Sequence, residues 1–302
     1  MRVLRRAVLA LCTWAACAAI QCAPRALAKD LARVRVDFID VGQGDAALIT
    51  SPTGKTVLID GGPHEAGPRL VAFLRARRTG PLDLILLTHR HVDHLGGLPA
   101  VVESVGARIF MDAPTPHPGR EREHLMHALE RAHVPIRTAT PGRTIDLGGG
   151  ATLTLLGPPE PEIVGSRSDV NANSVVARLD YGSVRFLFTG DAERVTERWL
   201  LHERHADVRA RVLKVAHHGS RYSTSAELLD AVKPEIAVVS VGARNDYHHP
   251  APSTLRRLEA HGARVLRTDV DGTVTIESDG RTITAPPARA PSLATAREAE
   301  LR

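Results

Sequence analysis

The chain has 302 residues, of which 43% are hydrophobic and 24% are charged. This length supplies enough apolar side chains for one sizeable core, and nothing in the sequence requires two. The formal net charge is +5, but four of the 39 basic residues and none of the 34 acidic ones lie in the first 28 positions. The rest of the chain is therefore close to neutral, and only 3% of all residues are aromatic. Composition thus argues against a protein that binds nucleic acid through its overall positive charge, or one with many aromatic side chains on which single-stranded bases stack.

Residues 1–28 have the three parts of a secretory signal. Three arginines lie in the first six residues, an apolar run follows at 7–20, and Ala26-Leu27-Ala28 offers small residues where a signal peptidase cuts. The apolar run is short for a bilayer span, which needs about 20 residues. We therefore expect an exported protein, periplasmic or secreted, with no integral membrane domain once the signal is removed.

The cysteines leave two other modes of export open. All three lie inside the predicted signal, as Cys12, Cys17 and Cys22, so the mature chain would have no disulfide and no thiolate ligand. A lipoprotein attached through Cys17 or Cys22 is one alternative to a cleaved signal. An uncleaved membrane anchor is the other.

The remaining sequence alternates predicted strands and helices. In the first half, strands are expected at 34–40, 46–50, 56–59 and 82–88, and helices at 68–78, 98–105 and 120–133. In the second half, strands are expected at 144–147, 151–156, 174–179, 185–189, 212–215 and 236–241, with helices at 192–205, 226–231 and 253–261 and two short strands near the end. This order predicts one α/β domain over residues 29–284, with two β-sheets covered by helices. The tail at 285–302 has no strand pattern, and we expect it to be disordered.

A dense set of metal-ligand side chains follows the apolar strand at 82–88. Within six residues the chain presents His89, His91, Asp93 and His94, and two glycines follow at 96–97. Imidazole and carboxylate groups suit Zn²⁺, and they also accept Mn²⁺ or Fe²⁺. The alternative is a polar loop with chance histidines, but this spacing favours a metal site.

A metal site needs more ligands than this loop supplies, so the chain must return to it. One predicted strand ends in Asp191, an acid able to bridge two cations, and another ends in the pair His217-His218. Strand parity places His217 on the face of two apolar residues, Leu213 and Val215, so we predict His217 as the ligand and keep His218 as the alternative. A turn-capping Asp191 and a surface histidine pair are the non-functional interpretations.

Six blocks of sequence carry a family resemblance. They are FIDVGQGD (38–45), LIDGG (58–62), THRHVDHLGG (88–97), NANSVV (171–176), LFTGD (187–191) and LKVAHHGS (213–220), and His249-Pro250 follows them. In this order they resemble the metallo-β-lactamase superfamily, and within it the branch that includes the C-terminal domain of ComEC-type DNA-uptake proteins. The resemblance covers roughly residues 34–280.

The resemblance implies an αββα metallo-β-lactamase sandwich, with two mixed sheets and two divalent metal ions at one edge. It assigns His89 and His91 to the first metal, Asp93, His94 and His217 to the second, and Asp191 to the bridge between them. Asp60 resembles the acid that orients the ligand imidazoles.

One departure from the family pattern concerns the first metal. Many members bring a further histidine from the segment before the bridging acid, but no histidine lies between His133 and His202 here. That segment offers Asn171, Asn173 and Ser174 instead, as the ComEC-like branch tends to. The first site is therefore expected to be weak or under-coordinated, and a single bound metal stays an open alternative.

The expected chemistry is hydrolysis by a metal-bound hydroxide. Asp93 is a catalytic candidate as well as a ligand, and His218 and His249 are candidates for donating to a phosphate or protonating a leaving group. Each of the two histidines could also be purely structural.

The substrate is expected to be a phosphodiester, so the protein would be a phosphodiesterase or nuclease. Lys214, Arg185 and Arg221 lie near the motifs and are candidates for contacting phosphates. Lys214, Asn173 and Ser174 are also candidates for supporting the ligands or contacting the substrate. A phosphoester-cleaving enzyme of the cell envelope is equally compatible with the metal site. Two further alternatives are a hydrolase of a carboxyl derivative, such as a β-lactam or lactone, and a non-catalytic binding module. The sequence does not predict an oligomeric state.

Overall fold

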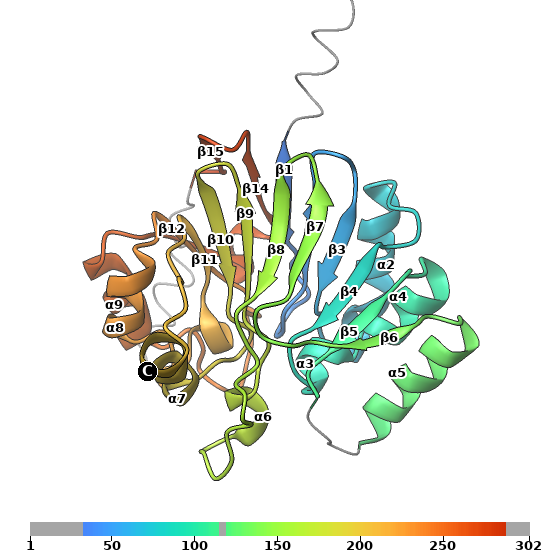
Figure 1. Cartoon of the computed structure of the whole chain (residues 1–302), viewed down its shortest axis with the longest axis horizontal. Coiled ribbons are helices and arrows are strands. Elements are labelled where there is room, and N and C mark those ends of the chain that lie inside the picture. Colours follow the sequence, from blue (N-terminus) through green and yellow to red (C-terminus); the bar gives the residue numbers. More distant parts are fainter. Residues whose placement is uncertain (1–32, 115–118, 288–302) are drawn as a thin grey trace, which may run out of the picture.

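The computed structural model describes residues 33–114 and 119–287. The predicted signal at 1–28 and nearly all of the predicted tail at 285–302 lie outside the described residues. Two mixed β-sheets pack face to face, and helices cover their outer sides (Figure 1). The predicted αββα sandwich is confirmed.

The first sheet has eight strands in the order β15-β14-β1-β2-β3-β4-β5-β6. Their bounds are β1 (Val34–Phe38), β2 (Ala47–Thr50), β3 (Thr56–Ile59), β4 (Leu84–Leu87), β5 (Phe110–Asp112), β6 (Ile136–Thr138), β14 (Val274–Ser278) and β15 (Ile283–Thr284). β3, β4, β5 and β6 pair in parallel, whereas β14 pairs antiparallel with β1 and places Val274 opposite Phe38. The end of the domain is thereby joined to its beginning.

The second sheet has seven strands in the order β13-β12-β11-β10-β9-β8-β7. Their bounds are β7 (Thr144–Gly148), β8 (Ala151–Leu155), β9 (Ala177–Tyr181), β10 (Val184–Phe188), β11 (Val212–Lys214), β12 (Ile236–Val239) and β13 (Arg264–Arg267). β10, β11, β12 and β13 are parallel to one another. Parallel strands end at the same edge of a sheet, so the segments after β10 and β11 meet there.

Helices from each half of the chain cover the sheet of that half. The first half has the 3-10 turn η1 (His64–Ala66) and the helices α2 (Gly67–Ala76), α3 (Val92–Leu95), α4 (Leu98–Ser104) and α5 (Arg120–Arg131). The second half has α6 (Asp169–Ala172), α7 (Arg194–Arg198), the π-helical turn η2 (Trp199–Glu203), the 3-10 turn η3 (Ala216–Gly219), α8 (Ala226–Val232), α9 (Pro252–Ala260) and α10 (Thr268–Asp271). In Figure 1, α2, α4 and α5 lie on one side of the sandwich and α7, α8 and α9 on the other.

The main core lies between the two sheets. The rings of Phe38 on β1 and Phe188 on β10 stack across it with their centroids 5.9 Å apart. On β8 the buried residues Ala151, Leu153 and Leu155 alternate with two partly exposed threonines, as expected for a strand with one face in the core. Two further apolar layers hold the helices onto the outer faces. The packed sandwich therefore supports the loops at its edge.

Several elements differ from the predictions. β5 and β6 were not predicted, because each has only three residues and too short a pattern to show alternation. The helix expected at 192–205 is α7 followed by the π-helical η2. The segment expected as a metal-binding loop becomes helical partway, where α3 begins.

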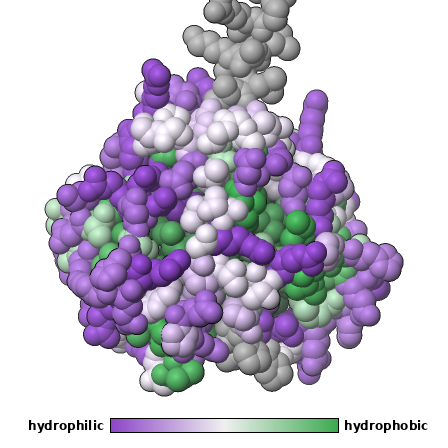
Figure 2. Space-filling model, viewed as in Figure 1, coloured by the Kyte–Doolittle hydropathy of each residue, from purple (hydrophilic) through white to green (hydrophobic). Residues whose placement is uncertain are grey.

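None of the helices in the described residues is both long enough and apolar enough to cross a bilayer. In the view of Figure 2, hydrophilic residues cover most of the visible face, and hydrophobic residues show as separate areas.

Candidate metal centre

The end of β4 brings the histidine-rich segment to the edge of the sandwich. His89 and His91 lie in the short connection after β4, whereas Asp93 and His94 lie in α3, which begins directly after His91. His91 has an extended backbone, and its carbonyl oxygen accepts the backbone N–H of His94 at 3.0 Å. The change from extended to helical backbone turns side chains from both parts toward one place.

Close backbone packing fixes this segment against the loop that follows β3. A Cβ atom at Gly97 would lie 2.2 Å from the carbonyl oxygen of Gly61, and one at Gly96 would lie 2.5 Å from the backbone nitrogen of His64. Gly61 in turn donates its N–H to the carbonyl oxygen of His94 at 2.6 Å. The two glycines after the ligand cluster are therefore required by contact between backbones.

Asp191 comes to the site from the second sheet. It follows β10 after Gly190, whose φ of 49° lies in the left-handed region. The Asp191 backbone N–H donates to the hydroxyl oxygen of Ser174 at 3.3 Å, and Asp191 is 1% exposed. Ser174 is itself fully buried, so the predicted supporting role of Ser174 takes the form of positioning this backbone.

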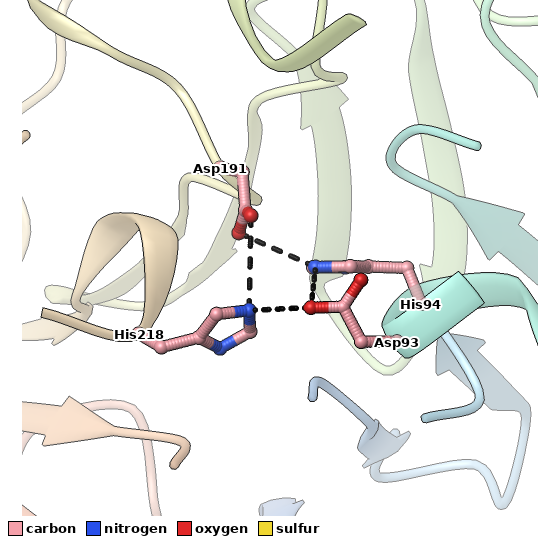
Figure 3. Close-up of side chains that lie close together, drawn as sticks. All are labelled: Asp93, His94, Asp191 and His218. Atoms are coloured by element: carbon pink, nitrogen blue, oxygen red, sulfur yellow. Dashed lines mark hydrogen bonds and ion pairs between the residues drawn. The ribbon is translucent and has the colours of Figure 1, made fainter. Parts of the chain in front are cut away.

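Four side chains form the larger of two groups that share Asp191. Its members are Asp93, His94, Asp191 and His218, and their ligand atoms all lie within 4.8 Å of one another. His218 Nε2 lies 3.1 Å from Asp93 Oδ2 and 3.7 Å from Asp191 Oδ2, and His94 Nε2 lies 3.3 Å from Asp191 Oδ1 (Figure 3). Figure 3 shows the four side chains converging from opposite sides of the site.

The structure places His218 in this group where the sequence analysis had placed His217. Strand β11 ends at Lys214, and both histidines lie in the turn η3 with φ values of 50° and 52°. Left-handed backbone interrupts the alternation of a strand, so parity counted from β11 does not extend to these residues. The contacts of His218 argue against it as a free proton donor, because its Nδ1 lies 3.0 Å from the Ser240 carbonyl oxygen and its Nε2 lies 3.1 Å from Asp93 Oδ2.

The smaller group consists of His89, His91 and Asp191. His89 Nε2 lies 3.1 Å from His91 Nδ1 and 3.7 Å from Asp191 Oδ2. His217 Nε2 approaches the same oxygen of Asp191 to 3.7 Å, and the amide nitrogen of Asn171 lies 3.5 Å from His217 Nε2. Asn171 and His217 therefore lie beside the first metal group, the one for which the sequence offers no further histidine between His133 and His202.

The free donor atoms fit a cation. His94 Nε2 and Asp191 Oδ1 are buried and make no hydrogen bond within the described residues, although they face each other as an ion pair at 3.3 Å; Asn171 Oδ1 is likewise buried without a hydrogen bond there. Buried polar atoms without partners are costly, and a cation would satisfy imidazole nitrogens and carboxylate oxygens together. The residues present thus fit divalent metal ions.

Asp60 holds one of these histidines in orientation, as the sequence analysis expected of it. Its Oδ2 lies 2.9 Å from His94 Nδ1 and accepts the Thr88 hydroxyl at 2.7 Å, and its Oδ1 accepts the Thr88 backbone N–H at 2.7 Å. A carboxylate on Nδ1 fixes the tautomer and leaves Nε2 for a metal.

Asp45 lies beside His218, the other histidine of the four-residue group, and was not predicted as a site residue. Its Oδ1 lies 3.4 Å from His218 Nδ1, and its other oxygen forms a buried ion pair with the ammonium group of Lys214. Lys214 is 4% exposed, so its burial favours the predicted supporting role over contact with a substrate. The sequence signal for Asp45 was its place in the FIDVGQGD block, directly after a glycine.

Neighbouring charges shift the pKa values of the ligand side chains. Burial alone would raise the pKa of Asp191, but His94 and His218 outweigh it and hold that pKa well below its usual range. Burial alone would lower the pKa of His94, but Asp191 and Asp60 outweigh it and hold that pKa well above its usual range. For His89, burial and then the charge of His94 lower the pKa well below its ordinary value, which leaves a neutral imidazole.

The centre opens into a cavity of about 550 Å³. Its walls include Gln43, Glu65, Asn171, Tyr247 and His249 beside the ligand groups. The ring centroid of His249 lies 5.5 Å from that of His217, and Nδ1 of His249 is buried without a hydrogen bond among the described residues. The structure therefore brings the predicted His249 to the site, and adds Tyr247, which the sequence analysis missed because nothing in the sequence marks an isolated loop tyrosine.

Two other candidates lie apart from the ligand groups. Asn173 is buried and bonds the backbone of Ile163, with 2.9 Å from the Ile163 nitrogen to its Oδ1, so it shapes the loop before α6 and is not among the residues that line the cavity. Arg185 forms ion pairs with Asp180 at 3.0 Å and Asp207 at 2.7 Å. Neither residue is placed to contact a substrate at this centre.

Comparison with known proteins identifies the family. Residues 39–243 match the metallo-β-lactamase superfamily. The chain belongs to this superfamily. It is 30% identical to the ComE operon protein 3 of Bacillus subtilis over 79% of this chain and 32% of that protein, and 30% identical to the competence protein ComA of Neisseria gonorrhoeae over 82% and 33%. The resemblance to the ComEC-like branch is thereby confirmed, and the chain spans about a third of the length of these relatives.

A solved structure agrees with the fold. The metallo-β-lactamase fold protein YhfI from Bacillus subtilis superposes with a TM-score of 0.53 at 15% identity, over 81% of this chain and 100% of that one. At this identity the likeness bears on the arrangement of the two sheets and their helices alone.

Proposed function

We propose that this metal-dependent hydrolase cleaves phosphodiester bonds, as a phosphodiesterase or nuclease. Its assignment as a metal-dependent hydrolase follows from the family together with the buried histidine–aspartate groups. The observation that carries the finer proposal is that Asp191 belongs to both ligand groups. Sites that hold two cations around a shared carboxylate suit in-line displacement at phosphorus, where charge develops on the attacking and the leaving oxygen.

The ions themselves are proposed to be zinc, and manganese or iron would also fit the donor set. The group of four would hold one ion through Asp93, His94, Asp191 and His218. The other would be held by His89, His91 and Asp191, with Asn171 and His217 beside them. When bound, the ions would lower the pKa of water to about 7 and offset negative charge on the phosphate.

The residues of the chain supply orientation and a hydrogen-bond donor. Asp60 fixes the ring of His94 through its Nδ1, and the Ser240 carbonyl oxygen fixes the ring of His218 through its Nδ1, with the Asp45 carboxylate close by. His249 lies outside both ligand groups and lines the cavity that contains them, so it is the residue proposed to hydrogen-bond the leaving oxygen. In the reaction a water oxygen bonds to phosphorus, the bond to the leaving oxygen breaks, and the proton lost by water ends on that oxygen.

Cellular location and domain boundaries form a separate part of the proposal. We infer that residues 1–28 are removed on export and that residues 29–284 form the hydrolase domain. Cell fractionation together with the mass of the mature chain tests this. A mass that includes residues 1–28, or activity found only in the cytoplasm, would contradict export.

The activity test uses the metal-loaded protein with bis-p-nitrophenyl phosphate and nitrocefin as alternative substrates. We expect metal-dependent cleavage of the phosphodiester, and we expect Asp93→Ala to abolish it. Asp246→Ala, which removes an exposed acid that belongs to neither ligand group, should retain the activity. Turnover of nitrocefin without phosphodiester cleavage would overturn the phosphodiesterase in favour of a hydrolase of carboxyl derivatives.

A further inference from the structure

A second cavity of about 480 Å³ adjoins the one that contains the metal centre. The two cavities share the wall residues His217, Tyr247 and His249. The remaining walls of the second cavity include Arg167, Arg221 and Tyr222. We call this cavity the arginine–tyrosine pocket. A substrate longer than one phosphodiester linkage would extend from the metal centre directly into it.

The arginine–tyrosine pocket is lined by basic side chains and by no acidic one. Arg167 and Arg221 line it together with histidines, and no carboxylate is among its lining residues. Neither arginine forms an ion pair with any acid in the described part of the chain, and both are exposed. Two guanidinium groups without acidic partners form a local site for phosphate oxygens, in a protein whose remaining charge is near neutral.

Aromatic surface lies next to these cations. The ring of Tyr247 stacks on His249 with the centroids 5.8 Å apart and an angle of 26° between planes, and Tyr247 is 68% exposed. On the other side of the pocket, the guanidinium of Arg167 lies 3.6 Å from the centroid of the Tyr222 ring. Flat rings and stacked guanidinium planes are the surfaces on which single-stranded bases stack.

We propose that the arginine–tyrosine pocket binds the nucleotide next to the scissile phosphodiester, with Arg167 and Arg221 at its phosphate and Tyr247 beneath its base. This inference rests on the proposed phosphodiesterase function, because it makes the pocket part of the same substrate path. The substrate class is then a single-stranded oligonucleotide, since a paired base would not present its face to Tyr247. Such a pocket is local, which agrees with the low overall charge of the chain.

The cleavage test compares a short substrate with one that reaches the second pocket. On this proposal single-stranded tetrathymidylate would fill both pockets, whereas bis-p-nitrophenyl phosphate would contact mainly the metal centre. We expect Arg221→Ala and Tyr247→Ala each to lower kcat/KM for the tetranucleotide about tenfold more than for the small diester, through KM. The matched control is Arg244→Ala, which removes an exposed arginine outside both cavities. Equal losses on the two substrates, or no loss on either, would overturn the proposal.

A binding test separates this inference from the proposed reaction. Fluorescence anisotropy of labelled tetrathymidylate is measured with the full chain in EDTA, where no turnover occurs. Weaker binding by Arg221→Ala and Tyr247→Ala than by Arg244→Ala would support the pocket. A metal-loaded protein that bound in this way but cleaved no phosphodiester would refute the proposed reaction and leave the pocket supported. Binding that is absent in the unsubstituted protein, or equal in all variants, would refute the pocket whatever the activity.

Discussion

The Asp60 carboxylate and the His94 imidazole form a buried contact of 2.9 Å between Oδ2 and Nδ1, directly behind the ligand-type Nε2 of His94. His218 has a similar arrangement, with Asp45 and the Ser240 carbonyl oxygen at its Nδ1. Both histidines of the four-residue group are therefore held from behind by groups that the sandwich positions. Their orientation is set before any metal binds.

Asp60→Asn is expected to lower metal affinity by about 10- to 100-fold, because an amide does not fix the ring of His94 as a carboxylate does. Competition with a fluorescent chelator measures this affinity. The fold should persist, so the circular dichroism spectrum serves as the control. Unchanged metal affinity in a folded variant would show that Asp60 does not orient His94.

The two adjacent histidines are distinguished by their metal content. His218→Ala removes a member of the four-residue group, so we expect it to lose about one equivalent of bound metal after dialysis, measured by elemental analysis. His217→Ala is expected to retain more metal than His218→Ala. The opposite order would restore the choice made from strand parity.

Gly97→Ala is expected to destabilise the protein severely, by several kcal/mol, because its Cβ would lie 2.2 Å from a backbone oxygen of Gly61. Gly80→Ala is the matched control, since a Cβ there meets nothing within 4 Å. Urea unfolding of both variants measures the difference. A Gly97→Ala protein as stable as the control would contradict the close backbone packing beside the ligands.

Lys214→Met leaves the buried carboxylate of Asp45 without its partner. Breaking a buried ion pair from one side typically costs about 3–5 kcal/mol, so we expect a clear fall in the free energy of unfolding. The double variant Asp45→Asn/Lys214→Met should lose less than Lys214→Met alone, because no buried charge is left unpaired. Equal losses in the single and double variants would show that the pair does not act as a unit.

His249 is expected to act as a neutral hydrogen-bond donor. Burial, followed by the charges of His217 and His218, lowers its pKa to about 4, so the ring is uncharged from pH 6 to 8. His249→Ala should therefore lower kcat by about 10- to 100-fold, by the same factor at every pH in this range. The ratio of unsubstituted to variant kcat is the measurement. A ratio that falls as pH rises through about 6.5 would indicate that the protonated ring is the active form.

Sequence patterns alone were enough to predict the fold and the metal centre. His89, His91, Asp93 and His94 are close in sequence, and their spacing after an apolar strand was enough to predict a metal centre. The strand alternation and the order of the motif blocks were enough to predict the sandwich. These signals are local or ordered along the chain, so they can be read without knowing which strands pair.

Which distant residues join the centre depends on how the chain folds. His218 replaces His217 because both lie in left-handed backbone, which no strand pattern anticipates. Asp45 and Lys214 lie 169 positions apart and pair only because β11 and the loop before β2 meet behind the metal centre. Likewise Arg167, Arg221 and Tyr247 come from three separate loops and line one pocket only in the folded chain. Contacts between residues far apart in sequence depend on sheet order and packing, and those are properties of the whole fold.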